Sequence, residues 1–178
     1  MKKLLLFALV FVVAMFRAQD SESVASKRIS EISKEDLKGF FTKEDKFENI
    51  VFITPTMVNN NSRYGYLVLD GDQLFFRYKI NYSGYSWIFA NKIIFLYDGE
   101  RYEIPYVEPK TEVFYGSVGE FIDFLCTPET IDVFRKIAVS KQADYRLEGT
   151  KGNSDSKFSN GSKKDLLKIL SLYDKLKK

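Results

Sequence analysis

The chain has 178 residues, with 27 Lys and Arg, 24 Asp and Glu, one Cys and no His. The lack of histidine excludes Ser-His-Asp and Cys-His catalytic centres and histidine-ligated metal sites, and a single cysteine excludes an internal disulfide. We therefore expect no catalytic centre of these kinds, no metal site and no cofactor.

The N-terminal segment has the pattern of an export signal. Lys2 and Lys3 precede an apolar run over 4–16, which is shorter than the roughly 20 residues of a membrane-spanning helix. This pattern predicts a bacterial secretory signal peptide over 1–18, cleaved near Ala18, and export to the periplasm or the exterior. The alternative is an uncleaved anchor. Residues 1–18 carry three basic residues and no acid, so the mature chain would be neutral and its charge does not indicate nucleic-acid binding.

Residues 19–46 are polar and charged, and we interpret them as a linker. A short helix over 33–40, capped by Ser33, is expected within this linker. Residues 47–178 have no internal repeat and no second zone of composition, which indicates a single domain.

The first part of the domain predicts a series of β-strands joined by short turns. Asp98-Gly99 is the clearest hairpin signal, because both residues tolerate the positive φ that a type I′ turn requires. Short connections make neighbouring strands antiparallel. The expected strands are 47–54, 63–69, 73–80, 85–89, 91–97, 100–107 and 111–118.

The period of the apolar residues then becomes helical. We expect a short helix over 120–126, a second helix that begins at Thr127-Pro128, a strand over 142–149 and a loop over 150–161. The last helix is expected to start at a Ser162 cap and to pack on the sheet through one apolar stripe. That stripe consists of Leu166, Ile169, Leu170, Tyr173 and Leu176. The fold class is therefore α+β: an antiparallel meander of about six or seven strands, covered on one face by C-terminal helices.

Lysines accompany the apolar stripe of the last helix, so contact with an anionic membrane surface is an alternative to core packing. We expect core packing and no membrane-surface contact. The lone Cys126 is expected to be buried.

Aromatic residues crowd the predicted strands, and they suggest a binding surface. Tyr82, Tyr85 and Trp87 flank the Ser83-Gly84 turn, where exposed rings could contact a peptide or a sugar. Arg146 is a candidate for binding a ligand anion. The alternatives are ordinary sheet packing for the rings and an ion pair with a neighbouring acid for Arg146. The sequence thus favours an exported, non-catalytic binding protein, whose partner is an unknown protein or carbohydrate.

The other function class is a hydrolase of carbohydrate or cell-wall material. Such an enzyme needs two carboxyl groups that face each other across a cleft. Glu108, Glu112, Glu120 and Asp123 lie close together in the sequence and could supply that pair. The alternative is that these acids are solvated side chains at turns and helix starts.

Overall fold

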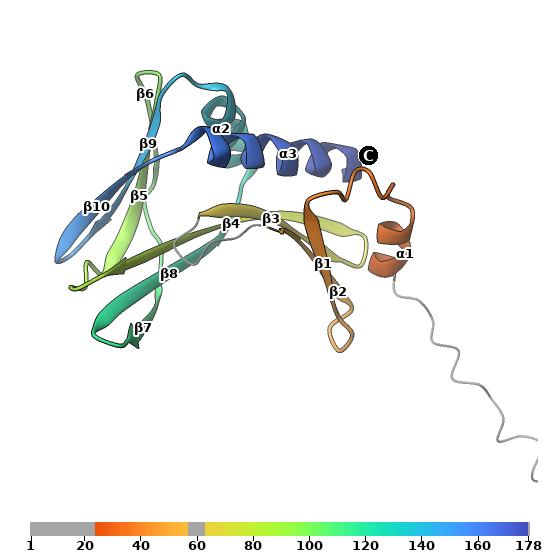
Figure 1. Cartoon of the computed structure of the whole chain (residues 1–178), viewed down its shortest axis with the longest axis horizontal. Helices are drawn as coiled ribbons and strands as arrows, with labels where there is room; N and C mark the ends of the chain where they lie inside the picture. Colours follow the sequence, from red (N-terminus) through yellow and green to blue (C-terminus); the bar gives the residue numbers. More distant parts are fainter. Residues whose placement is uncertain (1–23, 57–62, 178) are drawn as a thin grey trace, which may run out of the picture.

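The computed structural model describes residues 24–56 and 63–177. The expected signal peptide and its cleavage site near Ala18 lie outside these residues. The described elements are, in chain order, α1 (Val24–Ser30), β1 (Phe40–Asp45), β2 (Ile50–Pro55), β3 (Tyr64–Asp70), β4 (Gln73–Gly84), β5 (Ala90–Tyr97), β6 (Glu100–Ile104), β7 (Lys110–Phe114), β8 (Ser117–Leu125), α2 (Pro128–Val139), β9 (Ala143–Gly149), β10 (Gly152–Lys157) and α3 (Asn160–Leu176) (Figure 1).

The strands form two sheets, and all of their pairings are antiparallel. Sheet A has the order β1-β2-β3-β4-β8-β7, and sheet B has the order β10-β9-β5-β6. Helices α2 and α3 lie on one side of sheet A, and the β1–β2 and β7–β8 hairpins extend away on the other side (Figure 1). The predicted α+β class with antiparallel strands and C-terminal helices is confirmed.

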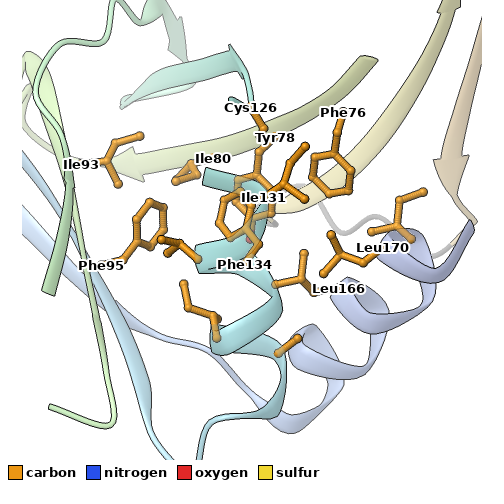
Figure 2. Packing of buried hydrophobic residues seen from close by; sticks show 14 of the residues in the cluster. Phe76, Tyr78, Ile80, Ile93, Phe95, Cys126, Ile131, Phe134, Leu166 and Leu170 are labelled. Carbon is orange, nitrogen blue, oxygen red and sulfur yellow. The ribbon is translucent and has the colours of Figure 1, made fainter. Parts of the chain in front are cut away.

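One hydrophobic cluster fills the space between the helices and both sheets (Figure 2). Phe134 of α2 is central to it, because its ring stacks on Tyr78 of sheet A at 4.3 Å and meets Phe95 of sheet B edge-on at 5.4 Å. Cys126 is buried in the same cluster, as expected. The two sheets therefore share a single core.

Helix α3 packs on sheet A through the expected apolar stripe. Four members of the stripe are buried and Leu176 is half-buried. The helix begins earlier than predicted: its N-cap is Ser159, whose Oγ accepts the backbone N–H of Ser162 at 3.1 Å, so Ser162 lies in the first turn. None of the helices in the described part of the chain has the length and apolar content that a membrane crossing requires.

The expected helix over 120–126 is wrong, because residues 120–125 belong to strand β8. Its side chains alternate between the faces of sheet A, with Ile122 in the core and Asp123 on the opposite face, and the strand pairs with β4 from Gly84↔Val118 to Arg77↔Leu125. The side chains of this segment therefore follow the two-residue alternation of a strand and not the 3.6-residue period of a helix.

The sheets also include segments that were expected to be irregular. Strand β1 lies within the expected linker 19–46, and strand β10 lies within the expected loop 150–161. Residues 33–39 form turns rather than a helix, although Ser33 Oγ does accept the N–H of Asp36 at 3.1 Å. Conversely, residues 85–89 are not a strand but the connection between the two sheets. The Asp98-Gly99 turn is as predicted, with φ of 45° and 90°.

Candidate functional site

The candidate site is built on the connection between the sheets. The chain leaves sheet A at Gly84 and enters sheet B at Ala90. Between them, Tyr85 is 93% exposed, Trp87 is half-buried and Phe89 is 38% exposed. Large aromatic side chains are thus displayed on a segment that has no strand partner of its own.

A buried acid fixes this connection. Glu120 of β8 is fully buried, and its carboxylate accepts the backbone N–H groups of Ile88, Phe89 and Ala90 at 2.7, 2.8 and 2.7 Å. A buried charge is unfavourable unless hydrogen bonds satisfy it, and three consecutive N–H groups form such an anion-binding arrangement. Glu120 therefore determines the path of the backbone beneath the aromatic rings.

Phe89 adopts a strained backbone conformation at this position. Its φ is 48°, in the left-handed region, where a non-glycine residue costs about 1–3 kcal/mol. The carbonyls of Phe89 and Ile88 accept the N–H groups of Thr150 and Lys151 at 3.2 and 3.0 Å. These bonds, together with those to Glu120, offset the strain and hold Phe89 in place.

Gly149 permits this close contact between the connection and the β9–β10 turn. A Cβ at this position would lie 2.1 Å from the carbonyl oxygen of Ile88, which is well inside van der Waals contact. Because the obstacle is backbone, no rotation of a side chain would relieve it.

The rings that result from this backbone path lie together. Trp87 and Phe89 stack with 5.7 Å between their centroids and 21° between their planes. The ammonium of Lys151 lies 4.9 Å from the Phe89 centroid, within the range of a cation–π interaction.

The β7–β8 hairpin brings further apolar residues to the same end of the molecule. Val118 pairs with Gly84 on one side and with Val113 on the other, so the hairpin tip lies beside the connection. Val113 is 73% exposed, Phe114 is 39% exposed and Tyr115, at the turn, is fully exposed. Figure 1 shows the end of β4, the start of β10 and the β7–β8 turn on the left side of the molecule.

We call this end of the molecule the aromatic end, and it comprises Tyr85, Trp87, Phe89, Val113, Phe114, Tyr115 and Lys151. Phe114 meets Phe121 edge-on, so its ring lies on the face of sheet A opposite to Glu120. Runs of three exposed apolar residues, as at 113–115, are unfavourable in water unless they serve an interaction.

The structure brings three of the four predicted site residues together. Tyr85 and Trp87 belong to the aromatic end, whereas Tyr82 supports it: its hydroxyl donates to the carbonyl of Ser86 at 2.8 Å and its ring lies against Gly84. Tyr82 therefore closes the turn that displays Tyr85.

Arg146 does not join them. It lies on the face of sheet B that points away from the core, and its Nε and Nη2 bind the two carboxylate oxygens of Asp155 at 2.6 Å each. Hydrogen bonding to Arg146 lowers the pKa of Asp155. Arg146 also lines a cavity of about 380 Å³ whose other lining residues include Ile94 and Leu96.

The four acids considered for hydrolysis do not form a facing pair. Glu120 binds backbone on the core side of sheet A, whereas Asp123 lies on the opposite face and accepts from Tyr66 at 2.7 Å and from Arg77 at 3.0 Å. Burial, and then this bond to Asp123, raise the pKa of Tyr66. Glu108 and Glu112 are exposed, and the described residues contain no group of acids and cysteine that could hold a metal ion.

The sequence did not indicate Phe89 or Lys151 as site residues, and it suggested Glu120 only as one of the acids of a hydrolase. The run Val113-Phe114-Tyr115 before Gly116 could have indicated an exposed apolar surface, because residues next to a turn glycine are expected to be exposed. The bonds of Glu120 join residues about thirty positions apart in the chain, and no local pattern reports them.

Comparison with protein-family models, curated proteins and solved structures found no match to this chain.

Proposed function

We propose that the chain is an exported, non-catalytic binding protein and that it contacts a partner protein through the aromatic end. The observation that carries this proposal is the strained Phe89, held by a fully buried glutamate so that its ring stacks on Trp87 near the surface. Strained backbone conformations persist where surrounding structure holds them, and they are frequent at binding sites.

The composition of the aromatic end supports a protein as the partner. Tyrosine and tryptophan are the residues that most often dominate the binding energy of protein interfaces. The aliphatic Val113 extends the apolar surface at the hairpin tip, where a complementary groove of a partner could bury it. A carbohydrate is the other ligand class that stacked rings accommodate, and the experiment separates the two.

Photocrosslinking in the producing cell tests the proposal. A photoreactive residue at Tyr115 should yield a specific adduct that protease digests, because the tip would be buried against a protein. The same residue at Val139, which is 73% exposed and lies at the end of α2, is the control. Adducts that protease does not digest but glycan-degrading enzymes do would indicate that the partner is a carbohydrate. Equal labelling at both positions would contradict a role for the aromatic end.

Variants give an independent test. Phe114→Ser with Tyr115→Ser should abolish the adduct formed by a photoreactive residue at Tyr85, because they remove the hairpin part of the surface. Val139→Ser with Leu167→Ser removes two exposed apolar side chains elsewhere and should leave the adduct unchanged.

Export is a separate part of the proposal, and the sequence pattern at Lys2, Lys3 and residues 4–16 supports it. Mass spectrometry of the protein from the producing cell should find a mature chain that begins close to Gln19. Full-length chain retained in the inner membrane would contradict cleavage.

A further inference from the structure

A cavity of about 260 Å³ lies where the N-terminus of α3 meets the start of β3 and the middle of β4, remote in sequence from the aromatic end. Its lining includes Arg63, Tyr64, Tyr78, Ser159, Ser162 and Asp165. Apart from Asp165, these side chains offer hydrogen-bond donors or a positive charge.

The helix end contributes unused donors. Ser159 caps the N–H of Ser162 with its hydroxyl and the N–H of Lys163 with its carbonyl. The backbone N–H groups of Asn160 and Gly161 have no acceptor among the described residues. Because α3 has 17 residues, its dipole adds partial positive charge at this end.

Tyr78 provides an independent indication of a ligand. The residue is 2% exposed, its ring stacks on Phe134, and it lines the cavity. Hydroxyl groups of buried residues nearly always bond to protein or to water, so a hydroxyl that faces a cavity can be satisfied by what occupies it. Burial raises the pKa of Tyr78 and the charge of Arg63 acts in the opposite direction, so the hydroxyl is protonated at neutral pH.

Arg63 lines the same cavity, and its side chain is held by rings and hydrogen bonds. Its guanidinium lies over the rings of Tyr145 and Phe158, 4.9 Å from each centroid. Nη1 donates to the hydroxyls of Tyr145 and Ser156 at 3.4 and 3.3 Å, and Nη2 donates to the carbonyl of Lys157. The positive charge is thus fixed before any ligand arrives, which reduces the entropy lost on binding.

We propose that this cavity binds a compact oxyanion, a phosphate or carboxylate group, between the N-terminus of α3, the Tyr78 hydroxyl and the charge of Arg63. The hydroxyl and the free N–H groups donate to the anion, and Arg63 neutralises its charge. Asp165 is exposed on the rim and disfavours anions of high charge. The bound group would connect α3 to both sheets, because Arg63 already links β3 to β9 and β10.

Calorimetric titration and thermal unfolding of the mature chain test this site. Inorganic phosphate and acetate are added at constant ionic strength, with chloride as the reference. We expect saturable binding of at least one of them and a rise in Tm with its concentration. Tyr78→Phe keeps the ring and removes the hydroxyl, so it should weaken binding about tenfold, since one hydrogen bond to a charged group is lost.

Tyr97→Phe is the matched control, because Tyr97 is also a buried tyrosine but lies on β5, outside this cavity. Its anion affinity should equal that of the unchanged chain. Arg63→Gln should weaken binding at least as much as Tyr78→Phe. Binding of phosphate alone would identify a phosphate group, and binding of acetate would identify a carboxylate. The proposal is overturned if neither anion saturates, or if Tyr78→Phe and Tyr97→Phe behave alike.

Discussion

Glu120 shows how one side chain can determine a surface that it does not itself reach. Its carboxylate is fully buried, and each of its hydrogen bonds goes to backbone within the connection between the sheets. Hydrogen bonds to charged groups are the strong ones in proteins, and a buried donor that loses its acceptor is costly. The aromatic end therefore depends on a residue on the core side of sheet A.

Glu120→Gln tests this dependence. The variant keeps the shape of the side chain but replaces one acceptor oxygen with an NH₂ group that faces a backbone N–H. Because hydrogen bonds to charged groups contribute about 1.5–3 kcal/mol each, we expect a loss of about 3 kcal/mol or more in the free energy of unfolding by urea. Glu112→Gln on the exposed strand β7 should change it by less than about 0.5 kcal/mol. If Glu120→Gln and Glu112→Gln both changed the free energy of unfolding by the same small amount, the three hydrogen bonds of Glu120 would not hold the connection.

Among the elements, helix α3 and the β5–β6 hairpin could be predicted because their signals are local. The stripe of α3 repeats at helical spacing, and Asp98-Gly99 supplies the two positive φ angles of its turn. Strand β8 could not be predicted in this way: residues 121–126 are apolar except for Asp123, since Phe121 and Leu125 lie on the face opposite Ile122. Periodicity does not separate such a short apolar run from a buried helix.

The site, like the elements, could be predicted where its signals are local in the sequence and not where they depend on distant residues. Tyr85 and Trp87 follow from a turn signal flanked by rings, whereas the position of Phe89 depends on Glu120 and Gly149, which lie far from it in the chain. Long-range contacts of this kind are set by the tertiary fold.

Leu170→Ala tests the packing of α3. Leu170 is buried on sheet A, so the lost contacts and the cavity left behind should cost about 2–5 kcal/mol in the free energy of unfolding. Leu167→Ala on the same helix is the control, because Leu167 is exposed and its truncation should cost less than about 0.5 kcal/mol. Denaturant titration measures both. A cost for Leu170→Ala no larger than that of the control would refute core packing of the stripe.

Asp98 connects the β5–β6 hairpin to the segment between α2 and β9, and its effect should depend on pH. Its carboxylate accepts the N–H groups of Gln142 and Lys141 at 2.9 and 3.0 Å, and these bonds hold its pKa below the ordinary value of 3.8. A lowered pKa stabilises the fold above the unfolded-state pKa, and the contribution disappears as pH falls through the folded-state pKa.

Asp98→Asn tolerates the positive φ but does not titrate. The unchanged chain should therefore be more stable than the variant at neutral pH, and the two should converge below about pH 4. Urea unfolding at a series of pH values measures the difference. If the difference in the free energy of unfolding between the two chains were unchanged at the most acidic pH, the stabilisation by Asp98 would come from the turn conformation and not from its charge.

At the scale of the whole molecule, the two sheets are joined by a common core and by polar links. Phe134 contacts rings of both sheets, and Arg63, just before β3, binds Tyr145 and Ser156 of sheet B. Glu120 of sheet A binds the first residue of β5. Because neither sheet has a separate core, opening one of them exposes the apolar face of the other.

This shared core predicts that the aromatic end unfolds together with the rest of the molecule. Trp87 is the sole tryptophan of the chain, so its fluorescence reports the connection between the sheets, whereas far-ultraviolet circular dichroism reports all helices and strands. In urea the two signals should give superimposable transitions, which is the criterion for two-state unfolding. In Glu120→Gln both transitions should move to lower urea together, because the connection unfolds with the shared core and the variant lowers the free energy of unfolding of the whole molecule. A fluorescence transition that separates from the circular dichroism transition, in the unchanged chain or in the variant, would make the aromatic end an independently opening unit.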